Sequence, residues 1–265
     1  MPRRLALRGV ALVYLLVLLL APLGMVFYRT FQHGLHPVWQ ALSDPFTVHA
    51  FEMTLLATAI AVPLNTLFGV LCALAIVRRR FRGKGLLNAF IDLPLAVSPV
   101  VIGLSLYLLY APRGGWFGSW LSQHGFQVLF ALPAIVLATI FVSVPFVARE
   151  VIPTLRELGN EQEQAAATLG ATRWQRFWRI TLPSIRWAVI YGVILTTARC
   201  LGEYGAVAVV SGRIEGRTET ATTRIDDLIQ NFQEGGAYAM AVVLAAIAIL
   251  VLVLMMLTKP KESAY

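Results

Sequence analysis

Long apolar runs separated by short polar segments make up most of this chain. Each run is long enough to cross a hydrocarbon core of about 30 Å as a helix that rises about 1.5 Å per residue. The predicted spans cover residues 9–31, 53–77, 86–111, 128–150, 185–210 and 237–257. The pattern predicts an all-α integral membrane protein with about six transmembrane helices, a single domain over 1–265 and a core transmembrane region over 53–257.

Composition and charge agree with a membrane location. Hydrophobic residues make up 58% of the chain and charged residues 14%, whereas about a quarter of an ordinary soluble domain is charged. The net charge of +8 comes from basic residues in short segments between apolar runs. This distribution does not resemble a basic domain that binds nucleic acid, and we expect no nucleic-acid partner.

The distribution of Lys and Arg predicts the topology. The N-terminus, the 78–85 loop, the 149–186 segment and the C-terminus hold 16 of these residues, whereas the 29–52, 112–127 and 211–236 segments hold 5. The positive-inside rule therefore places both termini and the 151–184 loop in the cytoplasm. Arg3, Arg4 and Arg8 before an apolar run imitate a signal peptide, but the run is long and no small-x-small site follows it. We expect a retained first span.

Several predicted spans contain helix breakers. Proline frees backbone carbonyls and kinks a helix, which neighbouring helices or a water-filled path can compensate. The segment from Asp92 to Pro99 combines two prolines with Ser98, and it is the predicted bent segment beside a pathway. Two cysteines, Cys72 and Cys200, lie in apolar runs without metal-ligand spacing, so we expect no disulfide and no metal site. The other prolines in the spans are Pro63, Pro133 and Pro145.

The polar segment 160–183 predicts two short helices. Asn160 and Glu163 have N-capping spacing, the following alanines favour helix, and Gly170 ends it. Thr172 and Gln175 have capping-box spacing for a second helix. Its tryptophans and arginines alternate, which predicts a helix along the lipid headgroups. The alanines allow close approach by another protein, but an inert interfacial loop explains the residues equally well.

The spacing in this loop resembles the signature loop of ABC-importer permeases, which reads Glu-Ala-Ala, three residues, Gly, nine residues, Ile-x-Leu-Pro. The matching residues here are Gln164-Ala165-Ala166, then Gly170, then Ile180 to Pro183, with Gln164 in place of the usual Glu. The resemblance implies the type I importer permease fold. It also implies that 160–183 carries the coupling helix, which contacts an ATPase subunit through Glu163, Gln164, Ala165, Ala166 and Gly170.

The resemblance extends from about the second span to the C-terminus and is closest to the sulfate/thiosulfate permeases, in particular the W-type member of their paired T and W permeases. The segments that carry it are Asp92–Leu104, Val144–Pro153 and Ala198–Gly212. The related molybdate/tungstate permeases are the alternative, although they commonly have Pro-Pro where this chain has Ser98-Pro99. No anion site is visible in the sequence, so substrate assignment rests on this resemblance.

The family implies a bacterial inner-membrane complex. Its expected partners are a second similar permease, two ABC ATPase subunits that bind ATP and Mg²⁺, a periplasmic anion-binding protein and membrane lipid. No cofactor is expected on this chain. The sequence has no Gly-x-x-x-x-Gly-Lys-Ser/Thr phosphate loop, so the chain is not predicted to be an enzyme. Whether the permease pair is homodimeric or heterodimeric, and which residues form the gate, stay open.

Two charges lie inside the predicted fifth span. Arg199 and Glu203 are four residues apart and therefore share a helix face. Unpaired charges in a membrane are costly, so one interpretation is a structural pair. The other places both beside a pathway, together with Ser98 and Pro99, where Arg199 attracts an oxyanion and Glu203 tempers its affinity.

Two other function classes are alternatives to the permease. An ion-coupled secondary transporter usually needs several intramembrane carboxylates or broken helices in repeated halves, and one central carboxylate meets that pattern only in part. A membrane enzyme would need a catalytic motif. The histidines lie in two predicted external loops without metal-binding spacing; they are His33, His36, His49 and His124.

Overall fold

The regular structure of this chain is helical throughout the residues that the computed structural model describes, 2–32 and 34–257. His33, Lys259 and Lys261, which enter the sequence arguments, lie outside these residues. The elements are α1 (Pro2–Phe31), α2 (Leu35–Leu42), α3 (Pro45–Arg78), α4 (Lys84–Ala96), α5 (Pro99–Tyr110), α6 (Gly118–Gln123), α7 (Leu132–Glu157), α8 (Glu161–Thr168), α9 (Arg173–Arg176), the π-helical turn η1 (Phe177–Thr181), α10 (Leu182–Leu201), α11 (Gly205–Val210), α12 (Ala221–Gln230) and α13 (Glu234–Leu257). The predicted all-α fold class is confirmed.

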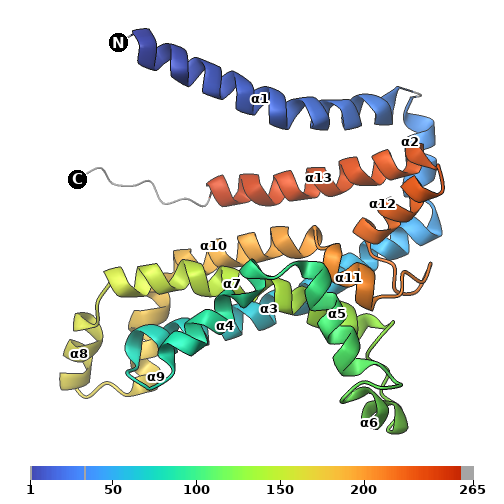
Figure 1. Ribbon diagram of the computed structural model, residues 1–265. Coiled ribbons are helices and arrows are strands. Elements are labelled where there is room, and N and C mark those ends of the chain that lie inside the picture. The colour runs from blue at the N-terminus through green and yellow to red at the C-terminus, as the bar shows by residue number, and fades with distance from the viewer. Residues whose placement is uncertain (1, 33, 258–265) are drawn as a thin grey trace.

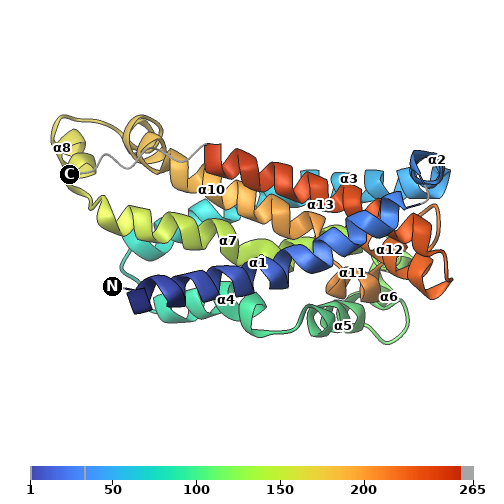
Figure 2. The same ribbon diagram turned by 90° about the horizontal axis from the view of Figure 1, so that it is seen from above.

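The described helices provide six candidate membrane crossings. Five of them, built on α1, α3, α7, α10 and α13, are each long and apolar enough to span a membrane. The sixth is the pair α4 and α5, which is bent by 111° between Ala96 and Pro99. Helix α1 begins and α13 ends toward the end of the molecule that carries α8 (Figures 1 and 2). The start of α1 and the end of α13 lie toward the same end, as expected for six crossings.

The centre of the bundle is the packing of α3, α7 and α10. A Cβ built on Gly69 of α3 would lie 2.7 Å from the Val147 Cβ on α7, and one built on Gly192 of α10 would lie 2.8 Å from the Val147 Cα. Both glycines therefore allow close helix approach, as small residues do in membrane bundles. Buried Asn65 of α3 also donates to the Ser143 hydroxyl of α7 at 2.7 Å, which adds an interhelical hydrogen bond.

The observed helices differ from the predicted spans at their ends. Helix α3 begins at Pro45 and not at residue 53, because the Asp44 carboxylate accepts from the Thr47 backbone N–H at 3.0 Å and proline suits the first helical position. The predicted 86–111 span is broken, and the predicted 185–210 span ends at Leu201. Segments expected as loops contain the short helices α2, α6 and α12.

Helices α1 and α13 form an outer layer on one side of the bundle. Helix α1 packs on α13 (Figure 2), and α13 packs on α2, α10 and α12. The apolar side chains of the α1 span are largely exposed in the isolated chain. Apolar exposure of this kind on a membrane helix is a surface for lipid or for another membrane chain.

Candidate functional site

Helix α8 projects at one end of the bundle (Figure 1). It ends as predicted at Gly170, which has a φ of +86°. The Ala171 N–H donates to the Ala166 carbonyl at 3.0 Å and the Gly170 N–H to the Ala167 carbonyl at 3.1 Å, which is the hydrogen-bond pattern of a Schellman stop. Asn160 is the N-cap residue as predicted, but its side chain makes no capping hydrogen bond. Acidic residues in the first turn still suit the helix dipole.

Glu163 faces the bundle and not the exposed side of α8. Its Oε1 lies 3.0 Å from Arg78 Nη2 at the end of α3, accepts from Arg78 Nε at 3.1 Å, and accepts from the Thr181 hydroxyl at 3.0 Å. Both side chains of the ion pair are about one fifth exposed. Glu163 therefore anchors α8 to α3 and η1. No local spacing predicts a partner 85 residues away, so the sequence predicts Glu163 in the first turn of α8 and in the ATPase contact but not its pairing with Arg78.

The exposed side of α8 is small and mostly uncharged. Gln164 and Ala165 are exposed and Ala166 is half-buried. Leu169, which follows the helix, is 88% exposed. Leu169 is not among the contact residues predicted from the sequence, although a bulky apolar residue directly before a helix-ending glycine is a signal for it. Together these residues form a surface, here called the α8 knob, that a partner protein can cover.

The second loop helix is not separate from the fifth span. The predicted capping box is confirmed: the Gln175 N–H donates to the Thr172 hydroxyl at 3.3 Å, and Gln175 Oε1 accepts from the Thr172 N–H at 2.9 Å. Helix α9 then continues through η1 into α10, forming one span from Arg173 to Leu201. Pro183 near the start of α10 cannot donate a backbone hydrogen bond, and the adjacent π-helical turn accommodates that loss.

Helix α10 ends at a break in the helical structure. The two charges predicted inside the membrane, Arg199 and Glu203, lie beside this break. Arg199 Nη2 is 2.9 Å from Glu203 Oε2, so the predicted pair is confirmed. Glu203, however, lies beyond the end of α10, where its Oε1 accepts from the Ala206 N–H in the first turn of α11 at 2.9 Å. A cation thus lies in the last turn of α10 and a carboxylate at the first turn of α11, which suits both helix dipoles. The backbone carbonyl of Glu203 also accepts from the Thr222 hydroxyl of α12 at 2.6 Å.

The bend between α4 and α5 lies against the break between α10 and α11. A Cβ on Gly205 would lie 3.0 Å from the Pro99 Cβ, and one on Gly103 of α5 would lie 2.7 Å from the Ala206 carbonyl of α11. Pro99 is therefore next to the break that contains Glu203. Ser98 precedes α5, is exposed, and its side chain makes no capping hydrogen bond. The structure thus brings two interrupted helices together.

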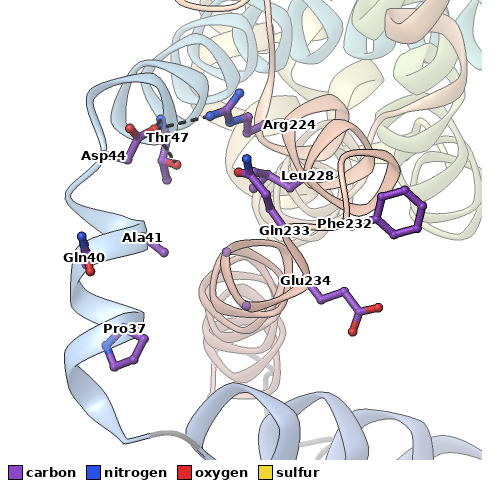
Figure 3. Close-up of a pocket in the computed structure, with 12 residues that line it drawn as sticks. Pro37, Gln40, Ala41, Asp44, Thr47, Arg224, Leu228, Phe232, Gln233 and Glu234 are labelled. Carbon is purple, nitrogen blue, oxygen red and sulfur yellow. Dashed lines mark hydrogen bonds and ion pairs between the residues drawn. The ribbon is translucent and has the colours of Figure 1, made fainter.

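A third group of charges lies at the end opposite α8. A pocket of about 430 Å³ has α2 on one wall and α12 and the start of α13 on the other (Figure 3). Arg224 of α12 lies 3.5 Å from Asp44, 2.5 Å from Glu215 and 3.5 Å from Glu219. Glu219 is 1% exposed, and this burial is the main cause that raises its pKa to about 8. None of these charged residues is among the site residues predicted from the sequence.

These features define the class of the molecule: a multi-pass α-helical membrane protein with interrupted helices and an exposed helical loop at one end. The chain belongs to the family described as the binding-protein-dependent transport system inner membrane component, whose model matches residues 65–262.

Relatives of known function are similar over most of the chain. It is 50% identical over 239 residues to a protein named sulfate transport system permease protein CysW from Synechocystis, covering 90% of this chain and 86% of that protein. It is 45% identical to the CysW of Escherichia coli K12, covering 89% and 81%. The CysT permease of the same strain is 39% identical, covering 90% and 86%.

Solved structures share the fold. A bacterial ABC transporter involved in alginate import matches with a TM-score of 0.81 at 17% identity, covering 99% of this chain and 98% of that one. An alginate transporter in complex with a pentasaccharide-bound periplasmic protein matches with a TM-score of 0.77 at 20% identity, covering 94% and 91%. The predicted importer permease fold is confirmed by these matches.

Proposed function

We propose that this chain is a permease subunit of an ATP-driven importer for sulfate and thiosulfate. The observation that carries the proposal is the uninterrupted helical connection from the α8–α9 loop, through η1 and α10, to the break at Glu203. An ATPase that moves the α8 knob would displace a rigid helix whose far end lies beside the interrupted helices. Rigid elements of this kind transmit a local movement to a distant site.

The break offers chemistry suited to a passing oxyanion. The Arg199 side chain is 32% exposed, so its guanidinium is within reach of a ligand, and Glu203 compensates part of its charge. Conduction needs sites that attract the ion but release it again. An arginine paired with a carboxylate meets that need better than an unpaired one. The relatives named sulfate transport system permease proteins CysW and CysT support sulfate as the anion.

The proposed complex contains other protein chains besides this one. A second similar permease is supported by the two kinds of similar relative, CysW and CysT. Exposed apolar residues of α5 provide a surface for it; they are Val100, Val101, Leu104 and Leu108. A periplasmic binding protein is supported by the complex seen for the alginate transporter. Two separate ATPase subunits would bind ATP and Mg²⁺ and contact the α8 knob.

Uptake by a strain that lacks this chain tests the substrate. We expect labelled sulfate and thiosulfate uptake to be lost and then restored by the wild-type chain, and to require a coexpressed ATPase. Loss of molybdate uptake alone would favour the molybdate/tungstate alternative. Gradient-driven transport by the purified chain without any ATPase would contradict the proposal and favour a secondary transporter.

The proposed orientation places the α8 end and both termini in the cytoplasm of a bacterial cell. Reporters fused after Lys84 or near Gln164 are expected to be cytoplasmic, and reporters near Gly114 or Glu219 periplasmic. A reversed result at either pair of positions would overturn the six-crossing arrangement.

A further inference from the structure

A basic groove lies between the end of α3 and the α9–η1 segment. It encloses about 580 Å³. Its polar side is formed by arginines from both elements, and its floor by apolar residues of α3 and by Phe177. The lining arginines are Arg78, Arg79, Arg173 and Arg176.

The charges of this groove are largely uncompensated. Among its lining residues, which the structure describes throughout, Glu163 is the single carboxylate, and it pairs with Arg78 at 3.0 Å. Arg176 reaches the Glu163 backbone carbonyl at 3.5 Å through Nη1, while its Nε is buried without a hydrogen-bond partner. Arg79 and Arg173 are exposed. The groove therefore presents about three positive charges to an anion.

The apolar floor of the groove favours a lipid as its ligand over a soluble anion. Leu71, Leu74 and Ala75 belong to the membrane-spanning length of α3, and Leu71 is 55% exposed. Trp174 and Trp178 on the neighbouring α9–η1 segment are also exposed, as is typical of aromatic residues at the headgroup level. Arginines above an apolar membrane face match a phosphate group with acyl chains below it. A soluble anion would leave that floor uncovered.

We propose that this groove binds an anionic phospholipid, with the headgroup phosphate between Arg79, Arg173 and Arg176 and an acyl chain along Leu71 and Leu74. A lipid in this position bridges α3 and α9, the same two elements that the Arg78–Glu163 pair connects through α8. Binding should therefore stabilise the loop that carries the α8 knob. The inference goes beyond the proposed transport function and does not depend on the identity of the transported anion.

Lipid titration of the full chain in neutral detergent tests the groove. Bound lipid is counted by native mass spectrometry with phosphatidylglycerol, with phosphatidylcholine of the same acyl chains, and with inorganic phosphate as competitor. We expect tight binding of phosphatidylglycerol alone, with about fivefold weaker binding for each arginine removed in Arg79→Gln/Arg173→Gln. The matched control is Arg156→Gln/Arg186→Gln, which removes two exposed charges at the same end but outside the groove.

Three results would overturn the proposal. Equal binding of the two lipids would show that charge does not select the ligand. Equal weakening by the control variant would show that the effect is not local to the groove. Displacement of the lipid by inorganic phosphate would indicate a soluble-anion site. The thermal unfolding midpoint of each variant without lipid confirms that it is folded, and a rise in that midpoint with phosphatidylglycerol but not phosphatidylcholine supports the bridging role.

Discussion

The Arg78–Glu163 and Arg199–Glu203 pairs have the same chemistry but hold different parts of the molecule. The first joins residues 85 positions apart at the end of the bundle, and both side chains are about one fifth exposed. The second joins residues four positions apart across the end of α10, and the Glu203 side chain is 2% exposed. The Arg78–Glu163 pair connects α8 to α3, whereas the Arg199–Glu203 pair stabilises the end of α10 and the start of α11.

This difference shows how one type of ion pair serves two purposes in the same chain. Glu163 holds a peripheral helix against α3 and η1, and water can still reach the pair. Glu203 lies in a buried position where an uncompensated charge would be expensive. We therefore expect loss of Glu203 to reduce mainly the stability of the fold. Loss of Glu163 should reduce mainly the coupling of ATP hydrolysis to transport.

The largest loss of stability is expected for Glu203→Leu. This change leaves the Arg199 charge without its partner and removes the acceptor for the Ala206 N–H, which together should cost about 3–5 kcal/mol. Glu203→Gln keeps an acceptor for that N–H and should cost less. Thermal unfolding of the purified complex and its abundance in the membrane measure both effects.

The double variant Arg199→Leu/Glu203→Gln separates the structural and pathway interpretations of the same pair. It removes both charges, so stability should largely return. If Arg199 assists the anion, this variant should hydrolyse ATP normally but transport sulfate poorly. Full sulfate uptake by a stable double variant would contradict the pathway role and leave the structural pair as the explanation.

A smaller loss of stability is expected for Glu163→Gln and for Arg78→Gln. Each removes a charge-assisted hydrogen bond that is partly exposed, and the expected cost is about 1–2 kcal/mol. Hydrogen exchange should accelerate in the amides of α8 but not in those of α10, because only the anchor of α8 is lost. The exchanged pair Arg78→Glu/Glu163→Arg should restore part of the protection, and equal acceleration in both helices would contradict the anchoring role.

A pH effect is expected at the opposite end, where Glu219 is only partly compensated. Its pKa is raised to about 8 in the folded chain, first by burial and then by Asp227, with Arg224 opposing the shift. The stability from this group is complete below its ordinary pKa and is lost as the pH rises through about 8. The unfolding midpoint should therefore fall by a few degrees between about pH 5 and pH 8 and level off at higher pH, because above the raised pKa the carboxyl is ionised in both the folded and the unfolded chain. Glu219→Gln should flatten this slope, whereas Glu234→Gln, at an exposed carboxylate, should not.

The sequence was sufficient for the crossings because each depends on local composition. Apolar length predicted the six crossings, Pro94 and Pro99 predicted the bend, and Gly170 predicted the end of α8. Each of these signals lies within a few residues of the feature that it predicts. The fold class could therefore be predicted almost entirely from the sequence.

Most errors concern contacts between distant residues or competition between local signals. Nothing near Glu163 predicts that it turns toward Arg78, so its inward position could not be derived from spacing. Arg199 and Glu203 have helical spacing, yet Gly202 and the capping of α11 by Glu203 end α10 between them. The sequence predicts a second loop helix along the headgroups and a fifth span from residue 185, but a π-helical turn joins the two into one continuous helix.

The smallest loss of stability, with a large loss of transport, is expected for Ala165→Trp on the α8 knob. Ala165 is exposed, so the indole meets solvent in the isolated chain, and the free energy of unfolding should change by less than about 0.5 kcal/mol. In the complex the added bulk would keep the ATPase from approaching α8, so sulfate uptake and transport-coupled ATP hydrolysis should fall together. Ala166→Trp should act likewise, whereas Gly170→Ala would instead strain a backbone at φ +86°. Gly85→Trp is the matched control, because Gly85 is an exposed small residue on α4 at the same end with open space around its Cβ. Normal uptake and ATP hydrolysis with Ala165→Trp, at normal membrane abundance, would show that the knob is not the docking surface and that energy enters the bundle elsewhere.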